Sequence, residues 1–110
     1  MAIDFSIPIL SLEGVAIDDV LAMQTNGGVK KTLTLGAVVC HALNTSFQED
    51  EKLAGSVKYA RGKLAYEIFS ATGPMNLKAE DIKTIKDLIP KLYGPLIVYR
   101  TFPLLDPAEK

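Results

Sequence analysis

From residue 34 onward, apolar residues recur at helical spacing. The first such group falls at i, i+3, i+4, i+7 and i+8, which is one face of a helix, and consists of Leu35, Val38, Val39, Ala42 and Leu43. Thr34 stands directly before it, where a threonine hydroxyl caps the first turn. We therefore predict a one-faced helix that starts after Thr34 and ends near residues 44–46.

A second helix is predicted to follow, beginning at an acidic run. Negative charge is favoured in the first turn of a helix, and the run contains Glu49, Asp50 and Glu51. The expected apolar stripe, with Phe69 alongside, consists of Leu53, Val57, Ala60, Leu64 and Ile68. Gly55 and Gly62 each weaken a helix by roughly 1 kcal/mol relative to alanine, so we expect them to mark close packing of another backbone. Gly73 and Pro74 end this helix.

The third predicted helix opens with Glu80 and Asp81, which suit the first turn. Its apolar residues are spaced by three and four positions, and they are Ile82, Ile85, Ile89 and Leu92. An interior proline removes one helical hydrogen bond and clashes with the preceding turn, at a cost of about 3 kcal/mol. We therefore expect this helix to kink or restart at Pro90.

The last apolar segment follows Gly94 and Pro95, a pair typical of a helix exit followed by a new helix with proline at its first position. The spacing of its apolar residues favours a terminal helix with a break at Pro103, although Ile97 and Val98 would also suit a strand. Residues 106–110 are expected to fray.

The first 33 residues have a different pattern. Residues 5–10 alternate imperfectly between apolar and polar, and Gly14 can adopt the positive φ that a tight turn requires, so a small hairpin is predicted here. Pro8 lacks a backbone donor, which places the first strand at an edge. Residues 18–23 fit either a helical turn or a continuing strand, and residues 25–28 form a loop.

The predicted fold is thus mainly α within the α+β class: an N-terminal β-hairpin arm (1–33), a helical body of three to four helices (34–105) and a frayed tail (106–110). With 110 residues, 48% hydrophobic and 23% charged, the chain has the composition of one folded domain. The net charge of −1 lacks the strong positive field of a typical nucleic-acid-coating domain. The first residues carry an acid and no basic leader, and no apolar run approaches a membrane span, so neither export nor membrane insertion is expected.

Candidate chemistry centres on Cys40 and His41, the only thiol and the only imidazole of the chain. A nucleophile needs its base within hydrogen-bond reach, whereas neighbours in a helix point about 100° apart. One cysteine and one histidine also fall short of the four ligands of a structural zinc. We predict no catalytic residue, no metal site, no cofactor and no enzymatic activity, and we expect a reducing, cytoplasmic setting.

Two surfaces remain as candidates. Aromatic residues near two prolines are typical of protein interfaces, and this candidate protein-contact set is Tyr93, Pro95, Tyr99 and Phe102. A basic face on the second and third helices would suit nucleic acid, and this alternative set is Lys58, Arg61, Lys83 and Lys86. Glu67 follows Lys63 by four residues and Asp87 follows Lys83 by four, so ordinary surface ion pairs are the favoured interpretation.

Several segments together resemble small proteins encoded by tailed bacteriophages and prophages, over nearly the whole chain. They are residues 33–38 (LTLGAV), 64–68 (LAYEI), 76–82 (NLKAEDI), 85–89 (IKDLI) and 93–96 (YGPL). The sequence departs from that pattern at Lys78, where a capping threonine or serine is typical, and at Pro90, where glycine is typical. These motifs are caps, core stripes and a turn, and the biochemical role of such proteins is undefined.

The resemblance implies a phage accessory protein in the cytoplasm of the infected host or in the virion. Because no reactive constellation is present, we expect it to act by protein–protein contact, in virion or tail assembly or on a host protein. The alternative is a nucleic-acid-binding accessory protein of phage replication or recombination. Self-association through the hairpin edge or the apolar C-terminal segment is also expected.

Overall fold

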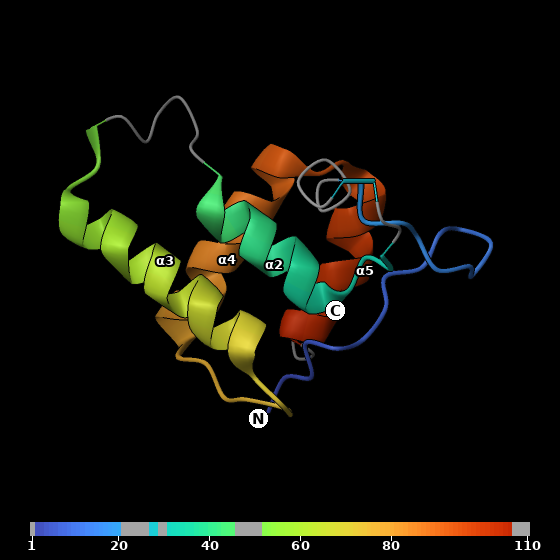
Figure 1. Ribbon diagram of the computed structural model, residues 1–110, viewed down its shortest axis with the longest axis horizontal. Helices are drawn as coiled ribbons and strands as arrows, with labels where there is room; N and C mark the ends of the chain where they lie inside the picture. The colour runs from blue at the N-terminus through green and yellow to red at the C-terminus, as the bar shows by residue number, and fades with distance from the viewer. Residues whose placement is uncertain (1, 21–26, 29–30, 46–51, 107–110) are drawn as a thin grey trace.

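The computed structural model describes residues 2–20, 27–28, 31–45 and 52–106 of the chain, and the statements below concern these residues. The described part is mainly helical, as predicted, and has little strand. Its helices are α2 (Leu35–Asn44), α3 (Gly55–Ser70), α4 (Ala79–Leu92) and α5 (Pro95–Leu105) (Figure 1). None of the helices in these segments has the length and apolar character that crossing a membrane would need.

Helix α2 is the central element, because α3 and α4 both pack against it and α5 packs against α4 (Figure 1). All five apolar residues predicted to face inward are buried. The hydroxyl of Thr34 accepts a hydrogen bond from the amide of Ala37 at 3.1 Å, which is the predicted cap. The periodicity and the cap therefore identified this helix correctly, including its end at Asn44.

The N-terminal arm runs along the helical body through isolated bridges. These antiparallel bridges join Ile3 to Met75, Pro8 to Thr34, Leu10 to Ala16 and Asp18 to Thr32. Three apolar residues of the arm, Ile3, Phe5 and Ile9, are buried in the same core as α2. Arg100 of α5 holds the arm from the other side, since its Nε donates to the carbonyl of Leu10 at 3.1 Å and its Nη2 to that of Ser11 at 2.7 Å.

The chain reverses direction between Ser11 and Val15. The amide of Ser11 donates to the carbonyl of Val15 at 2.8 Å, and Gly14 has a φ of +83°, a value that side chains strongly disfavour. Of the predicted turn or strand at residues 18–23, positions 21–23 lie outside the described residues. Thr25 and Asn26 of the predicted loop and the tail at 107–110 also lie outside them.

Helix α3 differs from its prediction in its first residue and in which of its residues are buried. It begins at Gly55, so the acids at 49–51 precede it, and these acids lie outside the described residues. Ala65 and Ile68 are its buried residues and Leu64 is half-buried, whereas Val57, Ala60 and Phe69 are exposed. The N-terminal half of α3 extends beyond the end of α2 (Figure 1), and no neighbour among the described residues buries Val57 or Ala60 there.

The two interior prolines do not end their helices. Helix α4 continues through Pro90 to Leu92, and α5 continues through Pro103 to Leu105, which corrects the predicted restart and break. Both prolines lie in the last turn of their helix and both are exposed. At the end of a helix, the carbonyl that loses its partner can be hydrated, so the usual penalty falls.

Candidate functional site

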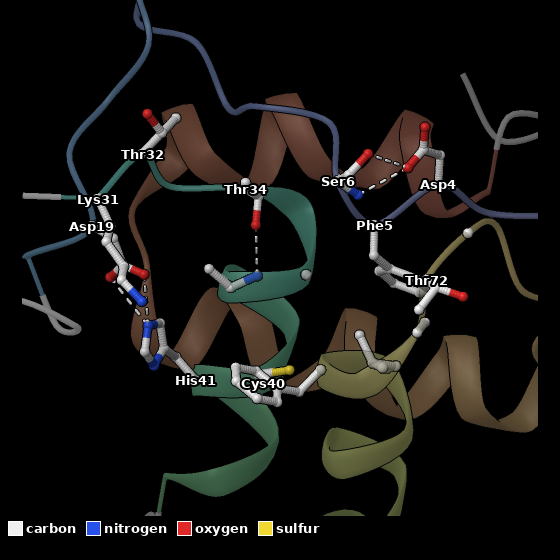
Figure 2. Close-up of a pocket in the computed structure, with 16 residues that line it drawn as sticks. Asp4, Phe5, Ser6, Asp19, Lys31, Thr32, Thr34, Cys40, His41 and Thr72 are labelled. Carbon is white, nitrogen blue, oxygen red and sulfur yellow. Dashed lines mark hydrogen bonds and ion pairs between the residues drawn. The ribbon is translucent and has the colours of Figure 1, made fainter.

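A hollow of the described surface lies between the N-terminal arm, the first half of α2 and the end of α3 (Figure 2). Its volume is about 510 Å³. The apolar part of its lining consists of Phe5, Ala37, Cys40, Ile68, Phe69 and Ala71. The polar part consists of Asp4, Ser6, Asp19, Lys31, Thr32, Thr34, His41 and Thr72. We call this hollow the arm groove.

The start of α2 sets the shape of the arm groove. A Cβ at Gly36 would stand 3.0 Å from the carbonyl oxygen of Phe5, so the absence of a side chain there lets the arm approach the helix. The amide of Gly36 donates a hydrogen bond to that carbonyl at 2.8 Å, and the amide of Leu35 donates one to the carbonyl of Ile7 at 2.9 Å. These contacts, together with the Thr34 cap, occupy the first amides of α2, so this helix start is not available to an anion.

At one end of the arm groove, Asp19 pairs with His41. The Nε2 of the imidazole lies 3.1 Å from both carboxylate oxygens. Asp19 is only 4% exposed, and its amide donates to the carbonyl of Lys31 at 2.7 Å. Burial of a carboxylate is costly unless hydrogen bonds satisfy it, so the pair fixes the end of the arm onto α2.

Cys40 points to the other side of α2 (Figure 2). Its Sγ donates to the carbonyl of Ala65 in α3 at 3.3 Å. Burial raises the pKa of the thiol to about 11. The sulfur therefore stays protonated at neutral pH and ties α2 to α3, while the imidazole of the next residue turns toward the arm.

At the opposite end of the arm groove, Asp4 and Ser6 form a small polar turn. The amide and the hydroxyl of Ser6 donate to Oδ1 of Asp4 at 2.9 Å and 2.6 Å. These hydrogen bonds, the side-chain one first, lower the pKa of Asp4. An ionised carboxylate therefore stands at the exposed end of the arm groove, close to Thr72 (Figure 2).

The thiol and the imidazole of the site both contact other parts of the chain. The one thiol is neutral and engaged with a carbonyl, and the one imidazole is engaged with Asp19 through Nε2. Within the described ranges, no group of three or more histidine, cysteine, aspartate or glutamate side chains is placed to hold a metal ion. What remains is an apolar surface bordered by hydroxyls and charges.

The predicted protein-contact residues differ in their exposure. Tyr93 and Phe102 are half-buried and pack against the core, while Pro95 and Tyr99 are exposed. The hydroxyl of Tyr93 is buried and has no hydrogen-bond partner in the described part of the chain. Burial first, and then the negative charge of Asp19, raise the pKa of Tyr93. This tyrosine belongs mainly to the interior, beside the Asp19 pair.

The predicted basic residues lie in two separate settings. Lys58 is exposed on α3 and Arg61 is half-buried there. On α4, Lys86 lies 3.8 Å from a carboxylate oxygen of Asp106 and 5.1 Å from the centre of the Phe102 ring. Lys83 shares a second hollow with Lys86, and this hollow also contains Asp87 and Asp106. Acidic side chains therefore border the lysines of α4.

No protein-family model, curated protein or solved structure matches the chain. The site consequently stands on its own geometry. Sequence reasoning missed Asp19 and the arm groove, because a lone aspartate in an irregular arm has no periodic signal. The one available hint was Gly36, a glycine in the first turn of a strongly predicted helix, which a close backbone approach explains.

Proposed function

We propose that the chain is a non-enzymatic accessory protein of a tailed bacteriophage that holds a segment of another protein in the arm groove. The partner is a phage protein in virion or tail assembly, or a host protein. The observation that supports this proposal is the groove itself, a hollow of about 510 Å³ with an apolar lining and a polar border. A hollow of this size accommodates one or two side chains of an extended segment.

The lining indicates what kind of segment fits. Phe69 is 80% exposed at the edge of the arm groove, and Phe5 and Ile68 lie beside it. An apolar side chain of the partner would cover Phe69, since burying exposed apolar surface is favourable by about 25 cal/mol per Å², whereas Phe5 and Ile68 are already buried. The ionised Asp4 at the border favours a neighbouring lysine or arginine in the same segment.

Two features support a role without catalysis. Cys40 and His41 turn toward different neighbours, and the thiol is neutral at physiological pH. An activated nucleophile requires the opposite: a shared hydrogen bond and a lowered pKa. The chain would then act in the cytoplasm of the infected host or as part of the virion.

Site-specific photocrosslinking tests this proposal. A photoreactive phenylalanine is placed at Thr72, on the border of the arm groove, and at Glu13, on the exposed turn of the arm, in cells where the encoding phage replicates. We expect a discrete adduct with one other polypeptide from position 72 and none from position 13. Adducts from both positions alike, or from neither, would contradict a groove-bound partner.

The identified partner is then tested with purified proteins by calorimetry. Ala37→Leu fills the arm groove from its α2 side, and Ala60→Leu makes the same change at an exposed position of α3. We expect Ala37→Leu to weaken binding at least tenfold and Ala60→Leu to leave it unchanged. Equal affinities of the two variants would reject the arm groove as the binding site.

The nucleic-acid alternative predicts a different result. Phosphate contacts make affinity fall steeply with salt, so a labelled oligonucleotide would bind at low ionic strength and dissociate as salt is added. If Lys58→Glu and Lys83→Glu each abolished such binding while the protein adduct was absent, the alternative would replace our proposal.

A further inference from the structure

Helix α3 has an aromatic stripe on its outer face. Tyr59, Tyr66 and Phe69 are 73%, 71% and 80% exposed, respectively. They are spaced by seven and three residues, so they lie on one side of the helix, and Tyr59 and Tyr66 point away from the buried Ile68. Figure 1 places α3 at the periphery, with α2 along its inner side. Three exposed rings in line form an unusual surface for a small protein.

Two glycines complete the stripe. Gly55 precedes Tyr59 by four residues and Gly62 follows it by three, so both fall on the same side of α3. The sequence predicted a close backbone at these glycines, yet no atom lies within 4 Å of a Cβ built at either position. The outer face of α3 therefore alternates between large rings and gaps.

We propose that two copies of the chain associate through this stripe, with their α3 helices antiparallel. When the helices cross near residue 64, Tyr66 of each copy faces Gly62 of the other. Tyr59 of each copy likewise faces Phe69 of the other. Tyr66 then enters the gap at Gly62 in both directions while Tyr59 packs against the ring of Phe69, and the interface joins identical surfaces. The helix dipoles also oppose each other in this arrangement.

The charges beside the stripe favour the same register. Lys63 and Glu67 are both exposed on one flank of the stripe, and neither has an ion-pair partner in the described segments. In an antiparallel pair, equivalent flanks face each other, so Lys63 of one copy meets Glu67 of the other, twice by symmetry. A parallel pair would instead bring opposite flanks of the stripe together, so Lys63 of one copy would not meet Glu67 of the other.

The area is consistent with a second copy. An aromatic side chain buries about 150–250 Å², so three largely exposed rings and their neighbours remove roughly 500 Å² from each copy. The total, about 1,000 Å², is at the lower limit of specific interfaces. The dimer should therefore form at micromolar to millimolar concentrations.

Sedimentation equilibrium of the full chain tests the dimer from about 1 μM to about 1 mM, a range that covers weak association. We expect a monomer–dimer equilibrium that Lys63→Glu and Glu67→Lys each weaken at least tenfold. The double exchange should restore it, because the opposite charges again face each other. Lys83→Glu makes the same charge change on α4 and should have no effect. Circular dichroism verifies that each variant is folded.

A photoreactive residue at Tyr59 provides a second measurement without charge changes. It should join two copies, with the attachment site at residues 66–72 of the second copy. A strict monomer throughout the concentration range would overturn the proposal, and so would a dimer insensitive to both single variants. Phe69 also borders the arm groove, so an adduct from position 72 counts for the groove partner only when it joins a different polypeptide. The present test uses the purified chain alone, and its outcome is therefore distinguishable from that of the arm groove.

Discussion

Helices α2 and α3 lie side by side but differ in how much of their apolar surface is buried. All five apolar residues of the α2 stripe are at most 4% exposed, whereas in the longer α3 only Ala65 and Ile68 are buried. Apolar side chains of α2 are covered by the arm, α3 and α4, while the aromatic side chains of α3 face solvent. The difference teaches that helical periodicity locates a helix well but identifies its inner face only when neighbours surround it.

Glycine shows the same contrast at a single position. Gly36 in α2 is in close contact with Phe5, whereas Gly62 in α3 has open space around it. One glycine is required by packing inside the chain. The other weakens its own helix without any such benefit inside the chain, which is why we assign it to a contact with a second copy.

The largest effect on stability is expected for the buried stripe of α2. Leu35→Ala removes a fully buried side chain of α2 and should lower the free energy of unfolding by about 2–5 kcal/mol. Val57→Ala on the exposed start of α3 should change it by less than about 0.5 kcal/mol. Urea denaturation measures both. Similar losses for the two variants would show that α3 is covered along its whole length.

A smaller effect is expected where the two helices meet, at Cys40. Because the pKa of its thiol rises from 9.0 to about 11 on burial, the thiolate fraction at pH 8 should be about a hundredfold lower than in the unfolded chain. Alkylation of the native protein should be slower by that factor and accelerate up to pH 11. The urea-denatured chain is the control. The thiol of Cys40 ionises at a lower pH in the unfolded chain than in the folded one, so the free energy of unfolding falls as the pH rises from 9 to 11.

Gly36→Ala probes the contact between the arm and α2. The added Cβ would stand 3.0 Å from a backbone oxygen and 3.2 Å from the Cβ of Phe5. We expect a loss of about 1–3 kcal/mol in the free energy of unfolding, as for other overpacked sites. An unchanged or increased stability would mean that the arm moves freely on the helix.

Gly62→Ala should change the free energy of unfolding less than Gly36→Ala does, and in the opposite direction. Nothing obstructs the new methyl group within one chain, and alanine favours a helix by about 0.8–1.0 kcal/mol over glycine. Thermal denaturation at a concentration where the chain is monomeric should show higher stability. A loss of stability would indicate a neighbour at Gly62 within the same chain.

Local signals in the sequence predicted some elements of the structure correctly and others not. The Thr34 cap, the α2 stripe and the acids Glu80 and Asp81 at the start of α4 were predicted as observed. Pro90 and Pro103 were overweighted, because the cost of an interior proline was applied to prolines that lie in a last turn. The α3 stripe was predicted correctly at its end, where Ile68 is buried and Leu64 half-buried, but Val57 and Ala60 are exposed because the start of α3 extends beyond α2.

The amino-acid sequence by itself determined the mainly helical architecture and the start of α2, since these depend on residues close together in the chain. Only the tertiary structure decided that Asp19 pairs with His41, that Cys40 bonds to Ala65, and that the arm and two helices enclose a groove. These contacts join residues 22 to 25 positions apart. Their geometry depends on how the arm and α3 pack around α2, which no local spacing encodes.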